Sequence, residues 1–105
     1  MFVRVATFEG IDPSQFEQAA PAARESAASI LKDVQGWKGA AQLLDRENRT
    51  LKIVQAFDSE ENMDAAEPIF QTMPKRLGDM AKVLGGPPRS VDKFEVMGQM
   101  GSLSG

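Results

Sequence analysis

Four residues on one predicted strand have the types and the spacing of a small-ligand site. Residues 50–58, TLKIVQAFD, are rich in β-branched and apolar types and predict a strand. Side chains alternate along a strand, so Leu51, Ile53, Gln55 and Phe57 share one face. Gln55 is then the one hydrogen-bonding group among three apolar side chains, which is the usual composition of a site for a small, mainly apolar molecule. The alternative, which the pattern leaves open, is that the four residues pack against helices with no cavity.

The residue types that are absent limit the chemistry such a site can perform. The chain contains no Cys, His or Tyr, which excludes thiol nucleophiles, imidazole bases, phenolic acids and the usual zinc and haem ligands. Catalysis is left to Asp, Glu, Lys, Arg, Ser, Thr, Asn, Gln or Trp37, or to a reaction that the substrate largely performs itself. We therefore expect no metal and no cofactor, and the catalytic residues stay unknown.

Three polar residues lie within otherwise apolar strand segments and are further candidates for the site. Arg4, Gln55 and Glu95 either point into a pocket, where each is able to fix a ligand's carbonyl or hydroxyl, or lie at a sheet edge or in an ion pair. Trp37 directly follows Gly36, and we expect its indole to pack between a helix and the sheet, where it buries a large area.

Charge and termini indicate few partners. The net charge of −3 is spread over both signs without long blocks, so we expect no nucleic-acid partner. The amino-terminal segment MFVRVATFEG has neither a signal-peptide pattern nor a membrane-spanning run, which predicts no membrane association. A cytoplasmic location is the default expectation, and the lack of cysteine agrees with it.

The first half of the chain predicts a strand, a long helix and a hairpin. Residues 2–9 form the strand, and Asp12 followed by Pro13 begins a helix that Gly36 ends. Pro21 predicts a kink or a restart near Ala19. Two antiparallel strands, at 38–46 and 50–58, follow with a turn in which we expect Asn48 to have a positive φ.

The second half predicts a helical region and a last strand. Ser59 caps a helix, and apolar residues continue at helical spacing to Leu84. Two prolines divide this region, with the helices meeting near Glu67-Pro68. Residues 89–97 alternate as the closing strand, and residues 98–105 form a flexible tail.

The order of elements predicts the fold class and a partner. One domain at 1–97, with strand, helix, two strands, helices and strand, favours an α+β, ferredoxin-like antiparallel sheet with helices on one face. The strands are apolar on both faces, as Val54 and Ala56 show on the face opposite Ile53. Because the second face needs a cover, we expect a homodimer formed through the sheets.

Over about residues 2–97, the chain resembles the antibiotic biosynthesis monooxygenase-like group of dimeric α/β-barrel proteins. The resemblance lies in four segments: Gly36-Trp37-Lys38-Gly39-Ala40, Asp45-Arg46-Glu47, Phe57-Asp58-Ser59-Glu60-Glu61 and Val91-Asp92-Lys93-Phe94-Glu95-Val96. These motifs specify architecture well and activity poorly. The resemblance implies a pocket between sheet and helices, with the face of Leu51, Ile53, Gln55 and Phe57 directed toward it.

The resemblance also implies where chemistry would be expected, and this chain departs from the pattern there. Oxygenases of the group that use no cofactor commonly have Trp and Asn at the positions of Phe57 and Ile53. The haem-degrading branch needs a histidine, which this chain lacks. Phe57 is therefore expected to be a pocket wall.

Three functions follow as hypotheses. The first is a monooxygenase-like protein that binds a small apolar or aromatic molecule, with oxygenation requiring a substrate that forms a stabilised carbanion and gives an electron to dioxygen. The second is a ligand-binding or accessory protein without catalysis. The third is a lactone isomerase or cyclase in which a carboxylate moves a proton.

Overall fold

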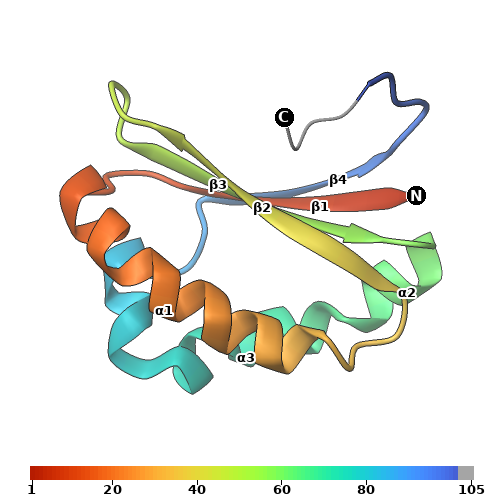
Figure 1. Ribbon diagram of the computed structural model, residues 1–105, viewed down its shortest axis with the longest axis horizontal. Helices are drawn as coiled ribbons and strands as arrows, with labels where there is room; N and C mark the ends of the chain where they lie inside the picture. Colours follow the sequence, from red (N-terminus) through yellow and green to blue (C-terminus); the bar gives the residue numbers. More distant parts are fainter. Residues whose placement is uncertain (102–105) are drawn as a thin grey trace.

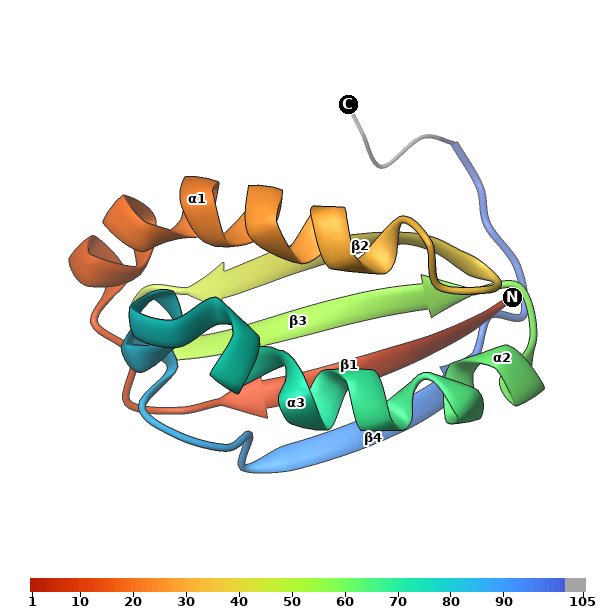
Figure 2. The same cartoon turned by 90° about the horizontal axis from the view of Figure 1, so that it is seen from below.

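A single antiparallel sheet forms one layer of the molecule, and the helices form the other. The computed structural model describes residues 1–101. The strands are β1 (Phe2–Phe8), β2 (Trp37–Asp45), β3 (Thr50–Phe57) and β4 (Ser90–Glu95), in the order β2-β3-β1-β4 (Figure 2). This is the ferredoxin-like α+β arrangement, and the predicted fold class is confirmed.

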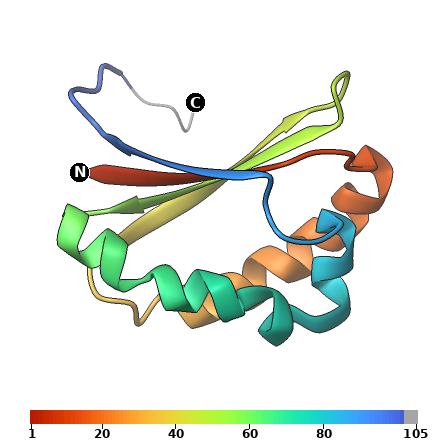
Figure 3. The ribbon, with the colours of Figure 1, turned by 180° about the vertical axis from the view of Figure 1, so that it is seen from behind.

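All the helices cover the same face of the sheet. They are α1 (Pro13–Leu31), α2 (Glu60–Ala65), α3 (Glu67–Leu77) and a 3₁₀ segment, η1 (Gly78–Leu84). Figures 1 and 3 show them on one side of the sheet, with α1 and α3 running beneath it. Among residues 1–101, no helix has both the length and the apolar character needed to cross a membrane.

Helix α1 begins as predicted and ends earlier than predicted. Asp12 caps its amino terminus by accepting hydrogen bonds from the amides of Ser14 and Gln15. The helix continues through Pro21 without a restart. Pro21 is on the exposed side of the helix, so water can satisfy the carbonyl one turn earlier that loses its partner. The last helical residue is Leu31, so Gly36 lies in the turn that follows and does not end the helix.

Gly36 is required where that turn meets the end of β3. Its φ is 80°, and its carbonyl accepts a hydrogen bond from the amide of Asp58 at 2.9 Å. A Cβ at this position would lie 2.4 Å from the side-chain oxygen Oδ1 of Asp58 and 2.5 Å from the side-chain nitrogen Nδ2 of Asn62. Only glycine fits this conformation and this spacing.

The β2–β3 hairpin forms as predicted, but a different residue takes the positive φ. Arg49 has φ 53°, whereas Asn48 donates through its side chain to Asp45 at 2.8 Å. The Arg49 guanidinium donates to the carbonyl of Ile11 at 2.8 Å, and the Ile11 amide donates to the Arg49 carbonyl at 3.0 Å. These two bonds tie the turn to the start of α1 and hold Arg49 in its unusual conformation.

The helical region divides one residue before the predicted position. Ser59 caps α2 by accepting from the amide of Asn62, and α3 begins at Glu67 after Ala66. Pro68 lies in the first turn of α3, where its missing amide costs little. After this break, the Glu67 side chain reaches Arg4 of β1 and forms an ion pair with it.

The core consists of two apolar clusters at opposite ends of the sheet. One is centred on Leu51 and Phe8, between the sheet and the start of α1. The other is centred on Phe57 and Met63, between the sheet and α2. Between these clusters the helices do not fill the space against the sheet, and a cavity remains.

The outer face of the sheet, opposite the helices, is covered by no helix or strand of residues 1–101. The register places Val3 beside Ala56 and Phe94, and Val5 beside Val54, on this outer face. Beyond β4, the chain rises on this side of the sheet (Figures 1 and 3). The predicted flexible tail stays a prediction, and its last residues, 102–105, lie outside the described part of the chain.

Candidate functional site

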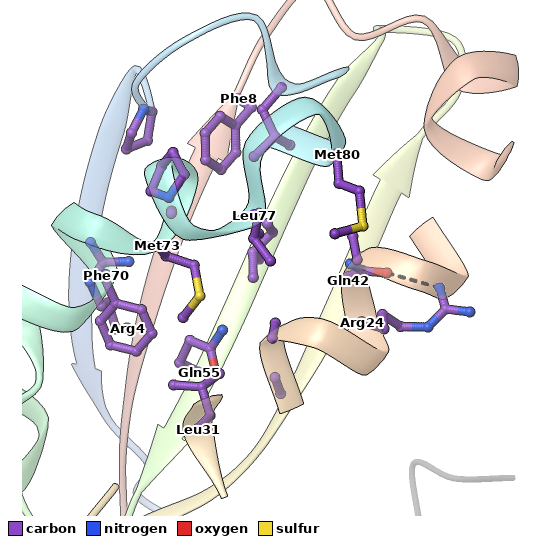
Figure 4. A pocket seen from close by; sticks show the side chains of 18 of the residues that line it. Arg4, Phe8, Arg24, Leu31, Gln42, Gln55, Phe70, Met73, Leu77 and Met80 are labelled. Atoms are coloured by element: carbon purple, nitrogen blue, oxygen red, sulfur yellow. Dashed lines mark hydrogen bonds between the residues drawn. The ribbon is translucent and has the colours of Figure 1, made fainter. Parts of the chain in front are cut away.

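A cavity of about 600 Å³ lies between the sheet and the helices. Its size falls within the range of pockets that hold small organic molecules. Figure 4 shows side chains from β1, β3, α1, α3 and η1 around this space. Its walls are mostly apolar and include Ala6, Phe8, Phe16, Leu31, Ile53, Phe70, Met73, Leu77, Met80, Val83 and Val91.

Small residues on α1 create much of this space. The helix presents five alanines to the cavity at helical spacing, namely Ala19, Ala20, Ala23, Ala27 and Ala28. A core helix usually presents larger side chains at such positions to fill the gap to the sheet. These alanines favour the helix but leave space between α1 and strands β2 and β3.

Two of the four residues predicted from β3 line the cavity, and two lie beside it. Ile53 and Gln55 form part of the wall. Leu51 and Phe57 are on the same strand face but are completely buried in the two apolar clusters, one at each end of the cavity. Phe57 packs edge-on against Phe70, with ring centroids 6.1 Å apart. The four residues thus face the helices together, while the open space lies over the middle pair.

Gln55 is a buried polar group held by Trp37. The Trp37 indole Nε1 donates to Gln55 Oε1 at 2.9 Å, and Gln55 is 7% exposed. This bond uses the carbonyl oxygen of the Gln55 side chain and directs its amide nitrogen elsewhere. Trp37 lines the cavity and packs against the Phe57 cluster, which agrees with its predicted place between helix and sheet.

Arg4 lies beside Gln55 on the neighbouring strand and is ion-paired. The two residues are cross-strand partners on β1 and β3, so their side chains are adjacent on the cavity face. Arg4 is 6% exposed and donates through Nε and Nη2 to the two carboxylate oxygens of Glu67, both at 2.9 Å. Its guanidinium carbon lies 4.5 Å from the centroid of the Phe70 ring, a cation–π contact.

Glu67 is held in its ionised form by this pairing. The hydrogen bonds from Arg4 lower the pKa of the Glu67 carboxyl below its ordinary value of 4.5, although partial burial opposes the shift. A carboxylate that has a lowered pKa and accepts two hydrogen bonds from one guanidinium is a weak proton acceptor. The pair therefore positions Arg4 and leaves Glu67 poorly suited to proton transfer.

The segment Phe57-Asp58-Ser59, at the end of β3, has a structural role. Phe57 is fully buried, Ser59 caps α2, and Asp58 accepts a hydrogen bond from the Asn62 side chain at 2.8 Å. That bond is the main cause of the lowered pKa of the Asp58 carboxyl. These contacts tie the strand end to α2, and none of the three residues lines the cavity.

Several residues of the site could not be identified from local sequence patterns. Glu67 is 63 positions from Arg4, and only the paired strands and the break before α3 bring them together. Arg24 of α1 donates to Gln42 of β2 at 3.0 Å across one side of the cavity (Figure 4). Glu95, the third polar candidate, is exposed on β4 and is not part of the cavity wall.

Within residues 1–101, no three carboxylate side chains lie close enough together to hold a metal ion. The cavity wall has few polar side chains. They are Arg4, Arg24, Trp37, Gln42, Gln55, Glu67 and Gln71. This arrangement is suited to binding an apolar molecule with few polar groups.

Comparison with known proteins identifies the fold. No protein-family model matches the sequence, and no curated protein matches it either. Among solved structures, the chain is similar to a Streptomyces coelicolor monooxygenase from the gene ActVA-Orf6, in complex with nanaomycin D. That similarity has a TM-score of 0.69 at 20% identity and covers 96% of this chain and 91% of the other.

Two further structures extend the comparison. A dimeric ferredoxin-like protein from an uncultured marine organism has a TM-score of 0.67 at 14% identity, with 96% and 98% of the two chains covered. A candidate antibiotic biosynthesis monooxygenase from Deinococcus radiodurans has a TM-score of 0.62 at 13% identity, with 98% and 99% covered. The protein therefore has an antibiotic biosynthesis monooxygenase-like fold, as the sequence motifs predicted.

Proposed function

We propose that this protein binds one small, mainly apolar or aromatic molecule in the cavity between the sheet and the helices. The observation that carries the proposal is the cavity of about 600 Å³ whose walls are apolar except for a few buried polar groups. The Streptomyces coelicolor monooxygenase of similar fold, solved with nanaomycin D, supports it by analogy of architecture.

The polar groups favour binding over proton-transfer chemistry. Among residues 1–101, Glu67 is the only carboxylate on the cavity wall, and the hydrogen bonds from Arg4 lower its pKa. This disfavours an isomerase or cyclase that needs a carboxylate to take up a proton. A non-catalytic binding protein needs no such group. Oxygenation in this cavity would require a substrate that itself forms a stabilised carbanion and passes an electron to dioxygen.

Thermal-shift screening tests the proposal. Quinones, flavonoids and polyketide-like aromatic compounds are added to the wild type and to a cavity-filled double variant, Ala23→Phe/Ala27→Phe. We expect some compounds to raise the melting temperature of the wild type, because a ligand that binds only the folded state stabilises it. The filled variant should not respond. If no compound raises the wild-type melting temperature, or if both proteins respond equally, the cavity is not a binding site.

We also propose that two copies associate through the outer faces of their sheets. Leu43 and Phe94, on opposite edge strands, are 52% and 55% exposed, and between them Val3, Val5 and Val54 make the face apolar. A contiguous apolar face of this kind marks an association surface. The dimeric ferredoxin-like protein of similar fold supports a second copy as the occupant.

A further inference from the structure

The cavity is apolar, but at one place on its floor two buried polar side chains still have hydrogen-bond donors to offer. Arg4 and Gln55 are cross-strand partners, 6% and 7% exposed, and both line the cavity. Each is held by a residue outside the strand pair, Arg4 by Glu67 and Gln55 by Trp37.

These supports use specific atoms and leave other nitrogens of the two side chains without a partner among residues 1–101. Arg4 donates to Glu67 through Nε and Nη2, and Gln55 accepts from Trp37 through Oε1. Over residues 1–101, Nη1 of Arg4 and Nε2 of Gln55 donate to no protein atom, yet no side-chain nitrogen or oxygen there is both fully buried and without a partner. The two nitrogens therefore keep access to the cavity space, and both are donors only.

The local charge restricts what these donors can bind. Arg4 is neutralised by Glu67 in a bidentate pair, so the site has donors without a net positive charge. A ligand carboxylate at this place would lie close to the Glu67 carboxylate in a poorly solvated site, and like charges there repel. A neutral carbonyl oxygen has two lone pairs, accepts hydrogen bonds only, and adds no charge.

From these observations we infer that Arg4 Nη1 and Gln55 Nε2 are a pair of donors that selects a ligand with a neutral acceptor, such as a carbonyl oxygen, over one with a carboxylate. The inference rests on the proposed ligand-binding function and adds the chemical class and the residues that select it. Gln55 is the specificity-determining residue, because Trp37 fixes its orientation. Arg4 is the second donor, fixed by Glu67.

Three tricyclic probes of similar shape test this by isothermal titration: fluorenone, fluorene and fluorene-carboxylate. A carbonyl that enters an apolar cavity without a donor loses its bonds to water, so a cavity without donors would bind fluorenone more weakly than fluorene. We expect the wild type instead to bind fluorenone about tenfold more tightly than fluorene, which corresponds to about 1.4 kcal/mol. Fluorene-carboxylate should bind more weakly than fluorene.

Two variants that break the same internal hydrogen bond provide a matched comparison. Gln55→Met removes the donor from the cavity and also the acceptor of Trp37. Trp37→Phe keeps the Gln55 donor and replaces the indole that orients it with a smaller ring on the cavity wall. We expect Gln55→Met to lower the ratio of fluorenone affinity to fluorene affinity severalfold, because only Arg4 Nη1 still donates. Trp37→Phe should lower that ratio less, because Gln55 keeps its donor but loses the bond that orients it. The infrared carbonyl stretch of fluorenone bound to the wild type adds a readout that needs no variant, since hydrogen bonding lowers its frequency.

The outcomes separate this inference from the proposed function. If fluorene and fluorenone bind the wild type equally, or if the preference is as strong in Gln55→Met as in the wild type, the carbonyl inference is overturned while the binding cavity stands. An unshifted carbonyl stretch in the bound state overturns it as well. If none of the three probes binds, the proposed function fails and the inference fails with it.

Discussion

Arg4 is a buried charged residue, and Glu67 is its ion-pair partner. Arg4 is 6% exposed within an apolar strand, and a buried charge of this kind is tolerated only when it is paired. Glu67 supplies both oxygens of the pair, and Phe70 covers the guanidinium from one side. Removing the carboxylate charge would leave Arg4 buried with only part of its compensation.

The substitution Glu67→Gln keeps the shape of the side chain and removes its charge. We expect it to lower the free energy of unfolding by about 1–3 kcal/mol at neutral pH, measured by urea denaturation. This is below the effect in a fully buried pair because the Glu67 side chain is still 27% exposed to water. Glu25→Gln, at an exposed position of α1, is the matched control and should change stability very little.

The same pair predicts a pH dependence with a definite sign. The pKa of the Glu67 carboxyl is lower in the folded state than its ordinary value of 4.5. The unfolded chain therefore takes up the proton first, so the stabilisation by Glu67 is complete above that ordinary value and is lost as the pH falls through the folded-state pKa. The stability difference between wild type and Glu67→Gln should shrink in that acid range. A difference that is constant down to acid pH would contradict the assignment.

At the scale of elements, α1 determines whether there is a cavity at all. Its five cavity-facing alanines are good helix formers but fill little space, so the helix is stable while the gap to the sheet stays open. The larger side chains of the same helix, Phe16 and Leu31, are buried and lie at its two ends. The cavity lies between these two anchoring points.

Filling the gap from α1 should therefore stabilise the protein without a ligand. We expect Ala27→Phe to raise the free energy of unfolding by about 1–2 kcal/mol relative to Ala22→Phe, because an aromatic ring enters existing space and buries apolar surface. Ala22 is exposed on the same helix, so its substitution includes the same change in helix propensity without burial. If Ala27→Phe is the less stable of the two, the space beneath α1 is not open as described.

The elements themselves were largely predictable from local sequence, and the site was only partly so. Asp12 and Ser59 act as caps, and alternation on β3 identified Ile53 and Gln55 on the helix-facing side, because these signals depend on neighbouring residues. The position of the open space depends on how far α1 stands from the sheet, which no local pattern records. For the same reason Leu51 and Phe57 had the same pattern as Ile53 yet lie in packed clusters.

The turns show a second limit of local reasoning. Asn48 has the composition expected for a positive φ, but Arg49 adopts it because its guanidinium reaches the carbonyl of Ile11. A contact across 38 positions of sequence thus overrides a local preference. The Arg4–Glu67 pair is of the same kind, with partners that become neighbours only after the sheet and α3 have formed.

At the scale of the whole molecule, the two faces of the sheet have different roles. The helices lie on one face of the sheet (Figure 1), and the cavity is on that side. The outer face exposes apolar side chains, among them Leu43 of β2 and Phe94 of β4. Association through the outer face would leave the cavity of each copy intact, since the two lie on opposite sides of the sheet. Ligand binding and dimer formation should therefore be separable by mutation.

Leu43→Asp tests the proposed dimer. Leu43 is 52% exposed on β2, so a carboxylate there is tolerated in a monomer, whereas two copies face to face would bury it unpaired. We expect sedimentation to give twice the chain mass for the wild type and a lower mass for Leu43→Asp at equal concentration. Ser29→Asp, on the exposed side of α1, should behave as the wild type. A folded wild-type monomer at micromolar concentration would contradict the dimer.

The fluorescence of Trp37 reports directly on whether the cavity binds a small apolar molecule. It is the single tryptophan of the chain and lines the cavity, so a quinone bound there quenches its emission. We expect menadione to quench the wild type along a saturable curve with one site per chain, and Ala23→Phe/Ala27→Phe to lose that saturable component. Quenching that rises linearly without saturation, or that is identical in the two proteins, would show only collisional contact and would contradict the claim.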